Sequence, residues 1–126
     1  MVIQYQEGMA LIIYGSEPLR EGLIALLTAI PQIKEITTAS NIQEAEKIVQ
    51  RQLPVLAFLL PPSSEKNLQI SAQKIKSKSP KTKCIALIDD EKQMNILLEA
   101  GVDCVKPKGF PANELFLVIQ KLLALQ

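Results

Sequence analysis

The sequence predicts a doubly wound α/β domain, in which helices cover both faces of a five-stranded parallel sheet of order 2-1-3-4-5. Two observations predict it. Short, uncharged apolar runs alternate along the chain with stretches whose apolar residues recur at helical spacing. The two most continuous runs, residues 10–14 and 55–60, are the first and third of the five, the positions that lie at the centre of such a sheet.

The first strand, residues 10–14, leads into a helix whose start is marked in the sequence. Ser16 can cap this helix with its hydroxyl, and Pro18 suits its first turn. Apolar residues then recur every three or four positions until Pro31 ends the helix. Residues 1–8, before the strand, form a leader of uncertain structure.

The second unit repeats this arrangement. Residues 33–38 contain β-branched side chains and predict a second, more exposed strand. Asn41 is expected to cap the next helix, with Glu44 three residues later as a reciprocal cap. The third strand, residues 55–60, has a proline on either side, which argues against a helix there.

Residues 65–78 predict a third helix, capped by Ser63 or Ser64, and residues 84–88 predict a fourth buried strand. This helix has the weakest apolar face, so it is expected to be the least firmly docked. Its inward face is expected to be Leu68, Ala72 and Ile75.

The fourth helix is expected to begin at residues 89–91, whose acids complement the helix dipole, and to end at Gly101. Residues 102–107 predict a short edge strand, because Pro107 cannot donate to a ladder. Residues 111–125 predict the last helix. The inner face of the fourth helix is expected to be Met94, Leu97 and Leu98.

Composition excludes several classes of function. The 126 residues predict one domain, residues 1–126, and a formal net charge of +1 gives no bias toward nucleic acid or membrane. The first eight residues lack the basic and apolar regions of a signal peptide, so a cytoplasmic location is expected. Histidine is absent, which removes the commonest general base and metal ligand. No metal, cofactor or enzymatic activity is expected.

The two cysteines, Cys84 and Cys104, are expected to be reduced and to act as small apolar side chains. Because they lie on neighbouring predicted strands, the thiols could be close together. A redox role is the less favoured interpretation, since adjacent parallel strands seldom give good disulfide geometry.

Three stretches resemble the receiver domain of bacterial response regulators, and most of all the receivers of helix-turn-helix transcription regulators. Residues 18–27 resemble the family's first helix, with one residue missing. Residues 39–45 resemble its second strand–helix junction, and residues 98–103, followed by Lys108, resemble its fourth helix and conserved lysine. The resemblance extends over residues 9–125 and implies the flavodoxin-like and CheY-like fold.

The resemblance also implies a phosphorylation pocket that this sequence lacks. Family receivers hold Mg²⁺ with two acids after the first strand and phosphorylate an aspartate after the third. A Thr or Ser after the fourth strand and a Lys after the fifth contact the phosphoryl group. The acid pair falls on Gly15 and Ser16, or on Tyr14 and Gly15. The phosphoacceptor falls on Leu60, the Thr or Ser on Ile88 and the lysine on Lys108.

Only the lysine of that set is retained, so the chain resembles a pseudo-receiver, a non-enzymatic module that acts through a protein partner or a homodimer. The second hypothesis is the regulatory domain of a DNA-binding regulator whose output domain lies outside this chain. The third is a small flavodoxin-like enzyme. Leu60 and Ile88 are expected to pack together across the former pocket, while Lys108 is expected to be exposed or to pair with a nearby acid.

Apolar residues that point away from the predicted core suggest an interaction face on the last helix and its neighbours. A cluster of lysines on the third helix and the turn after it offers a weaker hypothesis of nucleic-acid binding, and a solvated face is favoured instead. The lysines are Lys66, Lys74, Lys76, Lys78, Lys81 and Lys83. The candidate interaction residues are Ile96, Ala100, Val105, Phe116, Leu117 and Leu123.

Overall fold

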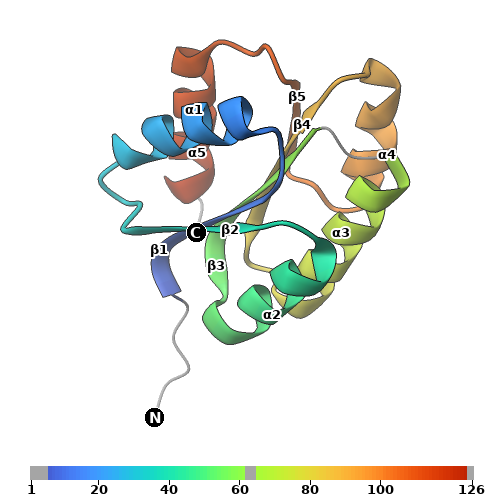
Figure 1. The fold of residues 1–126 in the computed structure, drawn as a ribbon, viewed down its shortest axis with the longest axis horizontal. Coiled ribbons are helices and arrows are strands. Elements are labelled where there is room, and N and C mark those ends of the chain that lie inside the picture. Colours follow the sequence, from blue (N-terminus) through green and yellow to red (C-terminus); the bar gives the residue numbers. More distant parts are fainter. Residues whose placement is uncertain (1–5, 62–64, 125–126) are drawn as a thin grey trace.

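A computed structural model describes residues 6–61 and 65–124, which form one five-stranded parallel sheet with helices on both faces (Figure 1). The strand order is β2-β1-β3-β4-β5, as predicted. The strands are β1 (Gln6–Tyr14), β2 (Glu35–Ala39), β3 (Pro54–Leu60), β4 (Lys83–Ile88) and β5 (Cys104–Pro107). The helices are α1 (Glu17–Thr28), α2 (Ile42–Gln52), α3 (Glu65–Lys78), the 3₁₀ turn η1 (Glu91–Gln93), α4 (Met94–Glu99) and α5 (Ala112–Ala124).

The sheet separates two apolar cores, because side chains alternate between the faces of each strand. On one face α2, α3 and α4 cover residues such as Leu11 and Leu59. On the other face α1 and α5 cover residues such as Ile12 and Phe58. Residues 9–13 of β1 and 56–60 of β3 are buried whichever face they point to, which agrees with their unbroken apolar sequences.

The helix starts follow the predicted capping pattern. The Ser16 hydroxyl accepts a hydrogen bond from the Leu19 amide at 3.4 Å. The Asn41 carboxamide accepts one from the Glu44 amide at 2.9 Å. α3 has the predicted bounds and its predicted inward residues are buried, whereas the predicted caps of this helix, Ser63 and Ser64, lie outside the described residues.

The ends of several elements differ from the prediction. β1 begins at Gln6, so part of the predicted leader is strand; Gly8 has a φ of 80°, and its carbonyl accepts a 2.7 Å hydrogen bond from the Lys34 amide. β2 begins at Glu35, two residues later than predicted. β5 begins two residues later than predicted, because the Val102 amide bonds back to Leu97 at the end of α4.

The fourth helix is shorter than predicted and buries a different residue. Asp90 caps η1 through its carboxylate, which accepts from the Lys92 amide at 3.0 Å, and α4 proper starts only at Met94. This starting point sets the rotation of α4 about its axis, so that Leu97 lies in the core and Leu98 is 45% exposed. The prediction that Leu98 faces inward is therefore wrong. Gly101 ends the helix with a φ of 105°, as its sequence position predicted.

Candidate functional site

The candidate site lies at the carboxyl edge of the sheet, where β1, β3, β4 and β5 end. An open depression of about 540 Å³ is found there. Of the residues predicted for the degenerate pocket, Ser16 and Lys108 line this depression, and Gly15 and Leu60 lie against one another nearby. Its other walls come from Pro18, Leu19, Pro61 and Asp89.

Leu60 fills the space beside the turn after β1. A Cβ atom added to Gly15 would lie 2.8 Å from Leu60 Cδ1 and 3.0 Å from Leu60 Cβ, closer than real Cβ contacts. Gly15 also has a φ of 95°, a conformation that costs other residues strain. Leu60 is fully buried. The two residues are therefore complementary, and neither leaves room for an acid.

The residue before this glycine is held by a contact that the sequence did not predict. Tyr14 has a φ of 65°, which is uncommon for a residue with a large side chain. Its hydroxyl lies 3.0 Å from the Ser71 hydroxyl on α3. Because the single proton of Ser71 goes to the Asn67 carbonyl at 2.7 Å, Tyr14 is the donor to Ser71. On the other side of the turn, Arg20 Nη1 donates to the Gly15 carbonyl at 2.6 Å.

The expected packing of Leu60 against Ile88 is wrong. Leu60 belongs to the core beneath α1 and α5, whereas Ile88 belongs to the core beneath α2, α3 and α4. The register pairs Leu59 with Ala86, so Leu60 lies level with Leu87 and faces the same side as that residue. Leu60 and Ile88 are nevertheless both core residues, at 0% and 1% exposure.

Lys108 pairs with a nearby acid, one of the two roles expected for it. Its ammonium lies 2.8 Å from Asp89 Oδ1, and the two side chains are 61% and 46% exposed. The Lys108 amide also donates to the Ile88 carbonyl at 2.9 Å, which fixes the loop that carries it. A pair this exposed contributes only about 0–1 kcal/mol of stability, but Asp89 offsets the charge of the Lys108 ammonium.

The donors around this depression do not fit the Mg²⁺ ion that receiver chemistry uses, because that ion needs several oxygen ligands and usually a carboxylate pair. Asp89 is bound to Lys108, and the Ser16 hydroxyl is used as a helix cap. Within residues 6–61 and 65–124, no group of three or more Asp, Glu, His or Cys side chains could hold a metal ion. Of the described residues that line this depression, Asp89 alone carries a carboxylate, and that carboxylate is paired with Lys108.

The two cysteines lie on opposite faces of the sheet, so the expectation that their thiols could be close together is wrong. Cys84 is in the core beneath α3, while Cys104 packs on the α5 side, opposite Ile85 in the β4–β5 register. Both are free thiols. Burial raises the pKa of Cys84 to about 12 and also raises the pKa of Cys104, so both favour the unreactive thiol form.

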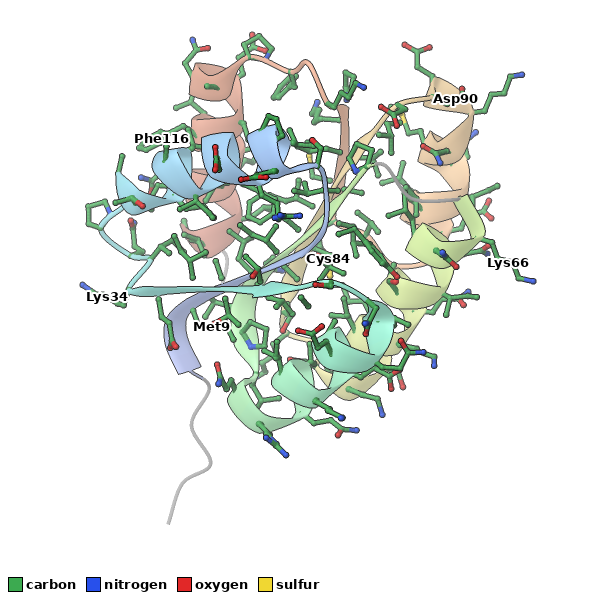
Figure 2. The ribbon with its side chains drawn as sticks, viewed as in Figure 1. Met9, Lys34, Lys66, Cys84, Asp90 and Phe116 are labelled. Carbon is green, nitrogen blue, oxygen red and sulfur yellow. The ribbon has the colours of Figure 1, made fainter. Side chains whose placement is uncertain are left out.

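The candidate interaction face is divided by the structure. Val105 is only 6% exposed and belongs to the core, so its assignment to a surface is wrong; it lies on β5 facing α4, where alternation turns it inward. Ala100 packs against the same core, and Ile96 is half-buried. Phe116 (Figure 2) and Leu123 are half-buried against the other core.

Leu117 is the most exposed apolar residue of this set, at 65% exposure. Sequence reasoning missed a shallow apolar groove of about 210 Å³ between α1 and the start of α5. Gly22 opens this groove, because a Cβ atom there would meet no other atom within 4 Å. A glycine in the middle of a helix was the signal in the sequence that could have indicated it.

Three of the six lysines in this cluster form ion pairs. Lys74 and Lys78 lie 3.0 and 3.7 Å from the Glu46 carboxylate. Lys76 bridges α3 to Asp103 at 2.8 Å, and the same carboxylate accepts from the Cys84 amide at 2.7 Å. These pairs fit the interpretation of a solvated structural face better than that of a nucleic-acid surface.

Comparison with solved structures identifies the architecture. A two-component response regulator from Clostridium difficile superposes with a TM-score of 0.79 at 21% identity, covering 96% of this chain and 97% of that one. The chain has the fold of a response-regulator receiver domain. This receiver fold also matches the receiver domain of a signal transduction histidine kinase from Syntrophus aciditrophicus (TM-score 0.78, 21% identity, 93% and 90% covered).

A DNA-binding response regulator of the LuxR family from Staphylococcus aureus matches as well, with a TM-score of 0.75, 19% identity, and 90% and 98% of the two chains covered. No protein-family model and no curated protein matches the sequence. Among the described residues, no helix is long and apolar enough to cross a membrane.

Proposed function

We propose that this chain is a pseudo-receiver, a cytoplasmic signalling module that keeps the receiver fold without the phosphorylation chemistry and acts by binding a protein partner or a second copy. The observation that carries the proposal is the contact between Gly15 and Leu60. These residues stand where receivers carry an acid and the phosphoacceptor, and here they fill that space with buried apolar atoms.

The electrostatics of the site support the same proposal. A receiver lysine must be available to a phosphoryl oxygen, and Lys108 is paired with Asp89 at 2.8 Å instead. A leucine cannot accept a phosphoryl group, and the remaining donors do not suit Mg²⁺. Any signal would then reach the domain at its surface rather than through this pocket. We also propose that the domain itself does not bind nucleic acid.

The test is incubation with a small acyl phosphate and Mg²⁺, followed by intact mass measurement. We expect the native mass to be unchanged, while a receiver with a complete acid triad, run in parallel, gains one phosphoryl group. A phosphoryl adduct on the native protein would overturn the proposal.

A second candidate function is the regulatory domain of a DNA-binding transcription regulator. The structural likeness to the LuxR-family receiver from Staphylococcus aureus favours it. In that case a helix-turn-helix output domain belongs to the same polypeptide. Sequencing the reading frame beyond residue 126 decides the matter, and a frame that stops there excludes this candidate.

A further inference from the structure

The outward stripe of α5 combines an exposed leucine with two opposite charges. Glu114, Leu117 and Lys121 are separated by three and four residues, so they lie along one side of the helix. All three are exposed, and Leu117 is exposed to 65%. Among the described residues, neither Glu114 nor Lys121 forms an ion pair. Both charges and the leucine are therefore available to another molecule.

The order of these residues is self-complementary. The midpoint between Glu114 and Lys121 falls between Leu117 and the half-buried Val118. If α5 lies antiparallel to α5 of a second copy about that midpoint, Glu114 faces the partner's Lys121 and Leu117 faces the partner's Val118. A two-fold axis repeats each contact, which gives two ion pairs around an apolar centre.

We propose that α5 pairs antiparallel with α5 of a second copy of this chain, through Glu114, Leu117, Val118 and Lys121. The proposal rests on the proposed function, for which it names the partner and the surface. The charges alone would also suit the dipole of an isolated helix, since Glu114 is in the first turn and Lys121 in the last. The dipole does not account for the exposed leucine between them.

The size of the surface sets the expected strength. One pair of helices buries less than the roughly 1,200–2,000 Å² of a standard interface, so we expect a weak dimer. Weak dimers form at concentrations of about 100 μM rather than in the nanomolar range. The ion pairs lie at the rim, so added salt should weaken the association.

The experiment is sedimentation and light scattering of the whole chain up to about 1 mM, with Glu114→Lys, Lys121→Glu and the double variant. Each single reversal replaces two attractions by two repulsions, so we expect dimerisation to weaken by about tenfold or more. The double variant should recover to within about threefold of the native value. A mixture of the two single variants should form a heterodimer, because both of its charge pairs are attractive.

Matched controls make the same charge changes elsewhere. Glu21→Lys on α1 and Lys47→Glu on α2 alter exposed residues outside the stripe and should leave dimerisation unchanged. Leu117→Glu should abolish it. Circular dichroism and thermal unfolding of each variant show whether the domain remains folded.

Three results would overturn the pairing: a native protein that stays monomeric at about 1 mM, a double variant weaker than either single variant, or a Leu117→Glu dimer of native strength. A monomer that binds a different protein through Leu117 would also overturn it. None of these results changes the phosphodonor assay, and a phosphoryl adduct there would refute the proposed function without altering the association data.

Discussion

Replacing Gly15 by alanine tests whether the turn after β1 and the end of β3 are matched. The added Cβ would lie 2.8 Å from Leu60 Cδ1 and would stand on a backbone with a φ of 95°. Left-handed backbone strain costs a non-glycine residue about 1–3 kcal/mol, and the steric contact adds to it. We expect Gly15→Ala to lower the free energy of unfolding by about 2–4 kcal/mol.

A double-mutant cycle separates the two causes. Leu60→Ala alone should cost about 2–5 kcal/mol, because it leaves a cavity in the core. Removing the leucine relieves the steric part of the Gly15→Ala cost but not the φ strain, so the double variant should be more stable than the sum predicts by about 1 kcal/mol. Urea unfolding followed by circular dichroism measures all four proteins.

Gly22→Ala is the matched control for this cycle. Its added Cβ meets nothing within 4 Å, and it lies inside α1, so alanine should stabilise the protein by about 0.5–1 kcal/mol. A neutral Gly15→Ala variant, or strict additivity with Leu60→Ala, would show that Leu60 does not occupy the space beside Gly15.

Two further predictions concern contacts of β1 and β4. Tyr14→Phe removes the hydrogen bond to Ser71 and should lower the free energy of unfolding by about 0.5–1.5 kcal/mol, with no change in the fold. Thermal unfolding measures this loss. A variant that unfolds at the same temperature as the native protein would mean that this hydrogen bond does not hold the turn. Burial raises the folded-state pKa of the Cys84 thiol to about 12, above its ordinary value of 9.0. The unfolded chain therefore loses this proton first, and stability should fall as pH rises from about 9 to about 12. Urea unfolding at pH values between 8 and 11 should show a shallower decline for Cys84→Ala, and equal slopes in the two proteins would refute the assignment.

The sequence predicted the fold because apolar runs and capping residues are local signals. The bounds of α3, the caps Ser16 and Asn41, and the end of α4 at Gly101 depend on neighbours within a few residues. The strand order followed from the alternation of strands with helices and from the burial of the first and third runs.

The side of the sheet that each residue faces was harder to predict. A shift of one position along a strand moves a side chain to the other core, so Leu60 and Ile88 were placed together although the sheet separates them. The same alternation separates Cys84 from Cys104. The prediction for Leu98 is wrong because the 3₁₀ turn before α4, which sets the rotation of that helix about its axis, has no clear signal in the sequence.

Long-range polar contacts were also outside the reach of sequence patterns. Tyr14 and Ser71 are 57 residues apart and meet only because α3 packs beside the end of β1. Nothing in the sequence indicated that the Asp103 carboxylate would pair with Lys76 and also accept a hydrogen bond from the Cys84 amide. Such contacts depend on the assembled fold rather than on spacing along the chain.

Under the proposed function, the contact between Gly15 and Leu60 would also make phosphorylation difficult to acquire by single mutations. An acid introduced at position 15 would collide with Leu60, and an aspartate at position 60 would be a buried carboxylate without a partner. Each step toward an active receiver therefore lowers stability before any metal can bind. Under the proposed function, single substitutions toward receiver chemistry at these two positions would destabilise the domain, so its surfaces are the part that could change at lower cost.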